Sequence, residues 1–283
     1  GFVKHEDVLD VSHAIITIQR DYGDRTDRKQ ARLKYLVDRV GLDWFREEVQ
    51  RRSGKQLVSY EPIAKWDFDD HLGWHDQKDG LLYVGIFIEN GRIQGEQRDK
   101  IRRIVEQFRP QVRITPQQNL VLSHIKPEDK EAIQSVLEEG HISSGNGWLS
   151  NLRRNQIACV ALPTCGLALA EAERVLPHLI GQLEERGYGE ERISIRLSGC
   201  PNSCSRAPLA EIGLLGRAPG KYNVYLGGDY LGTRINELFK EKVPFEELAG
   251  EIARLIDRWR NEREDGEAFG DYCLRVGVET LQQ

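Results

Sequence analysis

Apolar residues in the first part of the chain recur at the spacing of a helix. One run lies in a strongly basic segment and stops at a glycine: Leu33, Leu36, Val37 and Val40, followed by Gly41. A second short helix is expected to carry Trp44, Phe45 and Val49. Near the other end of the chain, a longer stripe predicts another helix with Phe245, Leu248, Ile252, Leu255, Ile256 and Trp259 on one face.

The middle of the chain alternates between strand and helix patterns. The apolar run 81–88 predicts a strand, and Asn-Gly at 90–91 is a turn signal. Residues 99–108 place apolar side chains on one helical face, and strands are expected at 112–114 and 120–125. A strand–helix–strand–strand order fits a split, ferredoxin-like sandwich.

The last part of the chain begins with a loop and continues with a helix. Residues 141–151 are rich in Gly, Ser and Asn and are typical of a connecting loop. A helix is expected from about Leu167 to Arg186, with Pro177 as a kink. Its inward positions are Leu176, Leu179, Ile180 and Leu183. Further strands are expected at 193–197, where alternation predicts half-burial, and at 211–215 and 222–226.

These patterns together predict an α+β fold. We expect a ferredoxin-like sandwich unit together with a larger α/β domain. The expected boundaries are 1–55 for a mostly helical segment, 56–126 for the ferredoxin-like half and 127–283 for the larger domain.

Composition narrows the class of protein. The 283 residues are 39% hydrophobic and 30% charged, which is an ordinary globular profile. A net charge of −5 argues against a general role on nucleic acids or membrane surfaces. No apolar run approaches the roughly 20 residues that cross a bilayer, and the N-terminus lacks the pattern of a secretory signal. Because the chain contains no Met, we expect that it was processed or is part of something longer.

Four of the five cysteines form two close pairs. Five residues separate Cys159 from Cys165, and three separate Cys200 from Cys204. An odd number of cysteines is a poor disulfide framework and fits a reducing compartment, where such clusters bind metal or do redox work. A proline between the partners of each pair prevents regular structure there, and four thiolates surround an iron–sulfur cluster only from irregular backbone. The spacing therefore predicts an iron–sulfur cluster.

Glycines near the cysteines support a cluster. Two alternative hypotheses for the cysteines are also open. Backbone N–H groups of the turn 198–201 are expected to point at the sulfurs, and Gly166 to open a helix whose positive end favours thiolates. Buried structural cysteines are one alternative. Structural zinc is the other, although the wider first pair exceeds usual zinc spacing. Cys273 has no partner nearby and is expected to pack in the core.

The segments around both pairs resemble a known family. Residues 158–177 and 197–216 look like the paired signature of sirohaem-dependent sulfite and nitrite reductases. The basic stretch 19–45 resembles the segment that precedes the second ferredoxin-like half in that family, and 226–239 and 269–279 resemble its C-terminal pattern. The resemblance covers nearly the whole chain and implies the C-terminal half of such an enzyme.

The resemblance also implies the cofactors, a role for Cys204 and a second half of the enzyme outside this chain. It implies one [4Fe–4S] cluster on the four cysteines, a sirohaem between two pseudo-symmetric halves, and Cys204 as the thiolate bridging cluster and haem iron. Residues 1–55 would then end the first sirohaem-binding domain, and 127–283 would be the cluster- and sirohaem-binding domain. The Arg/Lys residues that grip the substrate anion are expected in the other half, outside this chain.

Some residues of this chain are expected to contact the haem by the same resemblance. Sirohaem carries several carboxylates, so cationic partners suit it. One dense group of basic residues could supply such partners. Arg20 and Arg25 are expected to precede a helix, and Arg28 and Arg32 to share one face of that helix. The members of this basic group are Arg20, Arg25, Arg28, Lys29 and Arg32. The alternative is a solvated helix face paired with Asp24 and Asp27. Asn202 is expected to hydrogen-bond the cluster, and Gln118 and Asn119 echo a haem-contacting segment of the first half.

The function implied is the six-electron reduction of sulfite to sulfide, as a sulfite reductase in sulfur assimilation. Nitrite reduction to ammonia is the runner-up, and a non-catalytic iron–sulfur electron-transfer module is the alternative from another class. Expected partners are the small anion, the N-terminal half, and ferredoxin or an NADPH-dependent flavoprotein as electron donor, with no nucleic acid and no membrane. The expected location is the cytoplasm, or the plastid stroma in a eukaryote.

Overall fold

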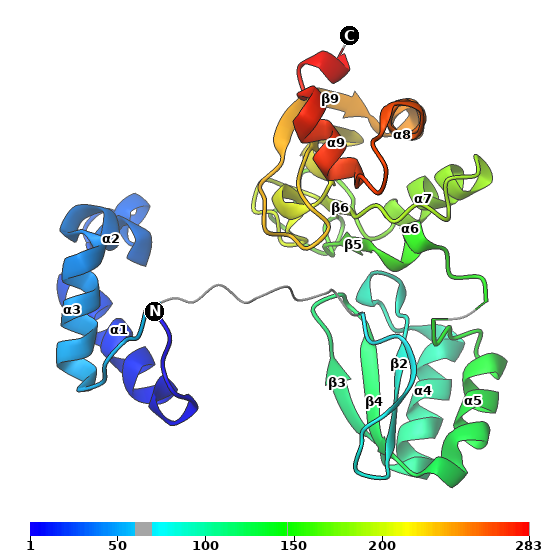
Figure 1. The fold of residues 1–283 in the computed structure, drawn as a ribbon, viewed down its shortest axis with the longest axis horizontal. Coiled ribbons are helices and arrows are strands. Elements are labelled where there is room, and N and C mark those ends of the chain that lie inside the picture. The colour runs from blue at the N-terminus through cyan, green and yellow to red at the C-terminus, as the bar shows by residue number, and fades with distance from the viewer. Residues whose placement is uncertain (60–69, 146, 283) are drawn as a thin grey trace. The chain divides into compact units, whose positions relative to one another are not determined.

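The computed structural model describes residues 1–59, 70–145 and 147–282, and separates the chain into two units, Gly1–Trp66 and Asp67–Gln283 (Figure 1). The first unit is helical, with α1 Val8–Tyr22, α2 Leu33–Val40 and α3 Leu42–Ser53. Its small core comprises Val11, Ala14, Ile18, Leu36 and Val49. The helix expected to end at Gly41 does so, since Gly41 has a φ of 85° that favours glycine.

The basic group of the first unit is arranged differently around the helices than the sequence predicted. Arg20 lies inside α1 instead of preceding a helix. Arg28 belongs to a short 3-10 turn, Arg28–Gln30, and Arg32 is the extended residue that precedes α2. The expected helix face shared by Arg28 and Arg32 is therefore wrong, because α2 begins only at Leu33.

The second unit begins with a four-stranded antiparallel sheet in the order β1-β2-β4-β3. Its strands are β1 Gly73–Asp76, β2 Leu82–Ile86, β3 Gln111–Ile114 and β4 Leu120–Ile125, and its helices are α4 Gly95–Phe108 and α5 Lys130–Glu139. Both helices lie on the same side of the sheet (Figure 1). Ile104 and Ile133 pack there against Val84 and Leu122, all fully buried. This arrangement confirms the expected α+β class, while β1 and α5 had no sequence prediction.

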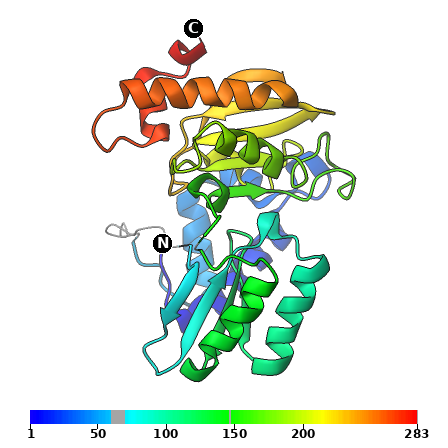
Figure 2. The ribbon, with the colours of Figure 1, turned by 90° about the vertical axis from the view of Figure 1, so that its right-hand side faces the viewer.

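The rest of the second unit is built on a mixed sheet in the order β5-β6-β7-β8-β9. The first three strands are parallel, and β8 and β9 are antiparallel to their neighbours. Figure 2 shows α8 lying along this sheet. The elements are β5 Gln156–Ala158, β6 Ile195–Ser198, β7 Ile212–Ala218, β8 Lys221–Leu226, β9 Glu237–Pro244, α6 Asn151–Arg154, α7 Leu176–Glu185, α8 Phe245–Glu262 and α9 Phe269–Val276.

The two faces of this sheet differ in chemistry. On one face, the aligned residues Leu197, Leu214 and Val224 join the apolar core that α7 and α8 complete. Alternation along β6 places Arg196 and Ser198 on the opposite face. All four β6 residues are buried, so the expected half-burial is wrong: a strand inside a parallel sheet is covered on both faces.

The predicted helix 167–186 is also corrected. It begins only at Leu176, and Pro177 lies in its first turn instead of kinking it. Proline is tolerated there because the missing N–H has no helical partner in any case. The four expected inward positions are fully buried: Leu176, Leu179, Ile180 and Leu183.

Candidate iron–sulfur site

Both cysteine pairs follow neighbouring parallel strands. Cys159 comes directly after β5, and Cys200 comes two residues after β6. The strands run in parallel with Ala158 aligned to Leu197, so their carboxyl ends meet at one edge of the sheet. Residues that follow adjacent parallel strands converge at such an edge, which is where open α/β sheets commonly bind ligands.

Gly199 joins the two cysteine loops. Its N–H donates to the sulfur of Cys159 at 3.2 Å, and its carbonyl oxygen accepts from Leu169 and Ala170 at 2.8 and 3.0 Å. A Cβ at position 199 would lie 2.6 Å from both the Ala161 Cβ and the Ala170 oxygen. The loops therefore approach so closely that only glycine fits between them.

Cys165 is held within its own loop. Its N–H donates to the Ala161 carbonyl at 2.7 Å, and its carbonyl accepts from Ala168 at 3.1 Å. The expected helix opening at Gly166 is not present, because the next helix starts at Leu176. Backbone N–H groups, and not a helix dipole, are thus the local source of positive charge.

Burial and electrostatics differ among the four thiols. Cys200 is buried, Cys159 and Cys165 are half-buried, and Cys204 is exposed. Burial raises the pKa of the Cys159 thiol, while the N–H groups of Gly199 and Ala161 act to lower it. Cys204 and Cys200 raise the pKa of Cys159 further, which means that these sulfurs share one electrostatic neighbourhood.

The donor set of four thiols, one of which accepts a backbone N–H, fits an iron–sulfur cluster. Among the described residues, no three His, Cys, Asp or Glu side chains converge closely enough to hold one metal ion. A multi-iron cluster holds its cysteines farther apart, and N–H donation to sulfur is a usual feature of such sites. The buried hydroxyl of Ser203, inside the second cysteine loop, has no hydrogen-bond partner and offers one further donor.

The structure places the other expected site residues in two regions. Asn202 is exposed between Cys200 and Cys204, in the second cysteine loop. The basic group lies in the first unit, where Arg20 pairs with Asp21 at 2.7 Å. Its remaining members are exposed, and no described carboxylate forms an ion pair with them: Arg25, Arg28, Lys29 and Arg32.

Asp24 and Asp27 do not neutralise this basic group. Asp24 accepts hydrogen bonds from the backbone N–H of Thr26 and of Asp27 at 2.8 and 3.2 Å, and Asp27 accepts from the backbone of Lys29 at 2.8 Å. The aspartates thus shape the turn, because Asp side chains readily bond to nearby backbone. The four exposed cations remain available to an anionic group.

Gln118 is a residue whose role the sequence did not reveal. Its side-chain amide donates to the Ala158 carbonyl at 2.8 Å and accepts from the Ala158 N–H at 3.2 Å. Ala158 directly precedes Cys159, so the ferredoxin-like part holds the backbone beside a cysteine. Asn119 bonds instead to the Ile88 N–H at 3.0 Å. No local sequence signal identifies a contact between residues 40 positions apart.

A second connection leads to the same loop through Glu173. The Glu173 N–H donates to the Cys159 carbonyl at 3.1 Å. Its own carbonyl accepts from the Asn90 side chain at 2.9 Å, and its carboxylate pairs with Arg92. The first cysteine loop is therefore fixed at Ala158, Cys159 and Glu173 by polar contacts.

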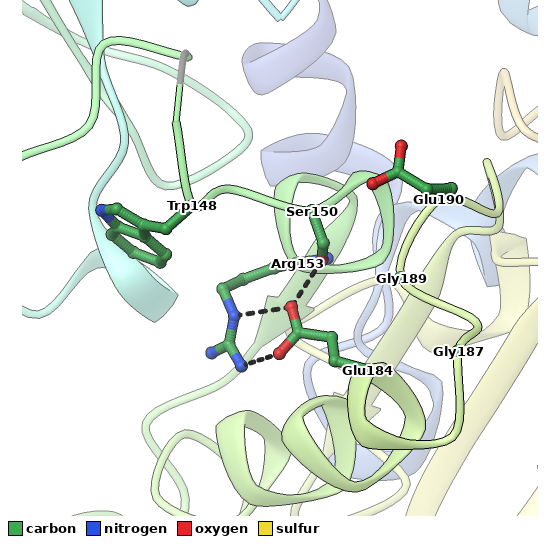
Figure 3. A pocket seen from close by; sticks show the side chains of 7 residues that line it. All are labelled: Trp148, Ser150, Arg153, Glu184, Gly187, Gly189 and Glu190. Atoms are coloured by element: carbon green, nitrogen blue, oxygen red, sulfur yellow. Dashed lines mark hydrogen bonds and ion pairs between the residues drawn. The ribbon is translucent and has the colours of Figure 1, made fainter.

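A separate cavity of about 560 Å³ lies beside α6 and α7 (Figure 3). Its lining residues include Trp148, Ser150, Arg153 and Glu184, and no cysteine. The Glu184 carboxylate accepts from Ser150 and pairs with Arg153. The Glu184 carboxylate is therefore already engaged, whereas the exposed Glu190 of the same lining forms no hydrogen bond or ion pair with these described residues.

Among the described residues, no helix combines the length and apolarity that a bilayer crossing requires.

Comparisons with known proteins identify the family. Residues 1–57 match the model of the nitrite and sulphite reductase 4Fe-4S domain, and residues 75–140 match that of the nitrite/sulfite reductase ferredoxin-like half domain. The four paired cysteines lie outside both matched segments.

Curated relatives extend the similarity over the whole chain. The NADPH sulfite reductase haemoprotein β-component of Staphylococcus carnosus is 43% identical over 98% of this chain and 50% of the relative. The corresponding protein of Lysinibacillus sphaericus is 44% identical over 99% of this chain and again 50% of its own length.

Solved structures agree in fold. The Mycobacterium tuberculosis NirA protein superposes with a TM-score of 0.84 and 28% identity, covering 99% of this chain and 54% of NirA. Dissimilatory sulfite reductase I, at 12% identity and a TM-score of 0.56 over 97% of this chain and 85% of its own, shares the fold. The chain spans about half the length of the curated relatives it matches, and it belongs to the nitrite and sulfite reductase family.

Proposed function

We propose that this chain binds one [4Fe–4S] cluster through Cys159, Cys165, Cys200 and Cys204. The observation that carries the proposal is the meeting of both cysteine pairs at the carboxyl ends of β5 and β6, with the Gly199 N–H donated to the Cys159 sulfur. N–H groups aimed at sulfur stabilise the electron-rich thiolate and raise a cluster's potential. When bound, the cluster would supply one-electron transfer.

We propose that sirohaem binds at the same edge and that Cys204 supplies the shared thiolate. Cys204 is the exposed member of the four, so its sulfur can meet a cofactor that lies outside this domain. Asn202, which is exposed in the same loop, is proposed to donate a hydrogen bond to the cluster. In the first unit, the exposed cations at positions 25, 28, 29 and 32 suit the carboxylates of the macrocycle.

The proposed reaction of the complete enzyme is the six-electron reduction of sulfite to sulfide. The names of the curated relatives support sulfite, and an NADPH-dependent flavoprotein component is the proposed electron donor, with ferredoxin as the alternative. Nitrite reduction to ammonia is the second candidate, since the matched family models describe nitrite as well as sulfite reductases. The other half of the enzyme would supply the cationic grip on the substrate, and the cytoplasm is the proposed location.

Expression of this chain with its N-terminal half tests the proposal. Anaerobically purified protein is expected to contain about five irons, four from the cluster and one from the sirohaem, with about four sulfides and sirohaem bands in the visible spectrum. Cys159→Ser should remove most of the iron, whereas Cys273→Ala should keep it, because Cys273 is fully buried in α9. Zinc without iron would contradict the cluster. Cluster absorption without haem bands would favour an electron-transfer module and contradict the reductase.

A further inference from the structure

Arg196 is a buried cation that the proposed redox site does not use. It lies on β6, on the face opposite the apolar core, and its residue is only 8% exposed. Its Nε is buried without a hydrogen-bond partner, and no carboxylate among the described residues forms an ion pair with it. An isolated buried charge is strongly unfavourable, so this guanidinium requires compensation.

The nearest acidic groups, Asp229 and Glu211, form no ion pair with Arg196 and direct their oxygens to other donors. The Asp229 carboxylate accepts hydrogen bonds from the Thr233 N–H, at 2.6 Å, and from the Thr233 hydroxyl. Glu211 accepts from the Ser194 N–H at 2.8 Å and the Gly270 N–H at 3.1 Å. Burial and, to a lesser extent, the nearby Arg206 lower the pKa of Arg196 to about 10, against the opposing effects of Asp229 and Glu211.

A small cavity adjoins the guanidinium. It has a volume of about 20 Å³ and is lined by the polar residues Gln117, Asn155, Ser194 and Tyr230 together with Ile157 and Arg196. Arg154 also lines it, but Asp70 already neutralises that arginine at 2.8 Å. A volume of this size holds one water-sized species, since about 10–15 Å³ is the minimum for a single water.

We propose that this cavity binds one monatomic anion, of the size of chloride or bromide, against the Arg196 guanidinium. An anion is favoured over water because a water molecule would satisfy the Nε hydrogen but leave the guanidinium without a direct ion-pair partner. Size decides against sulfate, phosphate and the sulfite ion, whose four or five-atom frames exceed one water-sized volume. The site lies at the amino end of β6, whereas Cys200 follows its carboxyl end.

Thermal unfolding in different salts tests the site. At equal ionic strength, chloride and bromide are expected to raise the unfolding midpoint of the chain by a few degrees over gluconate, because a ligand of the folded state stabilises it. Arg196→Met should remove this halide response. Arg217→Met is the matched control, since Arg217 is an exposed arginine of the same sheet, on β7, and its loss should leave the response intact.

Two results would overturn the proposal. One is a halide response that Arg196→Met leaves unchanged; the other is a sulfate response that depends on Arg196 as strongly as the chloride response does. If Arg196→Met does not fold, crystals of the unaltered chain soaked in bromide decide the question. An anomalous peak within hydrogen-bonding distance of the Arg196 guanidinium supports the site, and its absence at saturating bromide rejects it.

Discussion

The side-chain amide of Gln118 brackets the peptide unit of Ala158 with two hydrogen bonds, at 2.8 and 3.2 Å, next to Cys159. Gln118 comes from the ferredoxin-like sheet region, and Ala158 ends the edge strand β5. An edge strand of three residues has few ladder hydrogen bonds of its own. Gln118 therefore acts as a substitute for a neighbouring strand.

Replacing Gln118 should loosen the first cysteine loop. Gln118→Leu removes both hydrogen bonds and is expected to cost about 1–3 kcal/mol of unfolding free energy. In the cluster-loaded protein, absorbance in the presence of a chelator should decay faster. Gln107→Leu, at an exposed position of α4, serves as control and should match the unaltered protein. Equal decay rates for all three proteins would contradict the positioning role.

Gly199→Ala should disrupt the junction of the two cysteine loops. The added methyl would lie 2.6 Å from the Ala161 Cβ and from the Ala170 oxygen, so the backbone must move. We expect a loss of about 1–3 kcal/mol in urea unfolding, the usual cost of overpacking, together with reduced iron content. Gly166→Ala is the matched control, because a Cβ there meets no atom within 4 Å. Normal iron content in Gly199→Ala would show that the loops tolerate displacement.

Cys204→Ser separates the two proposed cofactors. If Cys204 supplies the shared thiolate, this change should lower sirohaem content more than iron content, whereas Cys159→Ser should lower iron first. Both variants are to be measured in protein expressed with its N-terminal half, by iron analysis and by haem absorption. Equal haem loss in both variants would argue against the bridging role of Cys204.

Glu211 gives the chain a predictable dependence on pH. Burial raises the pKa of this carboxyl to about 7, against the hydrogen bonds from Ser194 and Gly270 that act to lower it. Between pH 4.5, which is the ordinary pKa of the carboxyl, and pH 7, the folded state therefore keeps a proton that the unfolded state has released. This contribution is fully present below about pH 4.5 and is lost as the pH rises to about 7, by about 3 kcal/mol in all.

Glu211→Gln tests that dependence. The amide cannot ionise, so the difference in unfolding free energy between this variant and the unaltered chain should shift by that amount between pH 4.5 and 7.5. Urea unfolding at several pH values measures it. A constant difference across this range would mean that Glu211 is ionised in the folded protein throughout.

Long, regular patterns predicted the fold well. The stripe from Phe245 to Trp259 forms α8, and the runs at 81–88 and 120–125 contain β2 and β4. Three of the described strands escaped prediction: β1 and β5 have four and three residues, and the longer β9 buries only Phe239 and Val243 among mostly exposed residues. The helix predicted from Leu167 started late because the cysteine loop, tied to Gly199 through Leu169 and Ala170, overrides the helical spacing of its apolar residues.

The sequence likewise predicted some features of the candidate site and missed others. The spacing of the four cysteines and their placement in loops are local features that can be read directly from the sequence. The role of these cysteines as cluster ligands stays a prediction. Gln118, Glu173 and the buried Arg196 act through contacts between distant segments, which local spacing does not encode. Arg28 and Arg32 were expected to share a helix face, but Asp24 and Asp27 bond to the backbone there and form a turn.

The position of β5 at the sheet edge has a consequence for biogenesis. The strand that precedes Cys159 gains its second set of backbone partners only when Gln118 is in place, and Gln118 follows β3 in a different sheet. Its other neighbour, β6, comes almost 40 residues later in the chain. The four cysteines can therefore reach their final positions only after both sheets have formed. We therefore expect a bound cluster and the packing of the two sheets to stabilise each other, because metal binding is coupled to the folding that assembles its ligands.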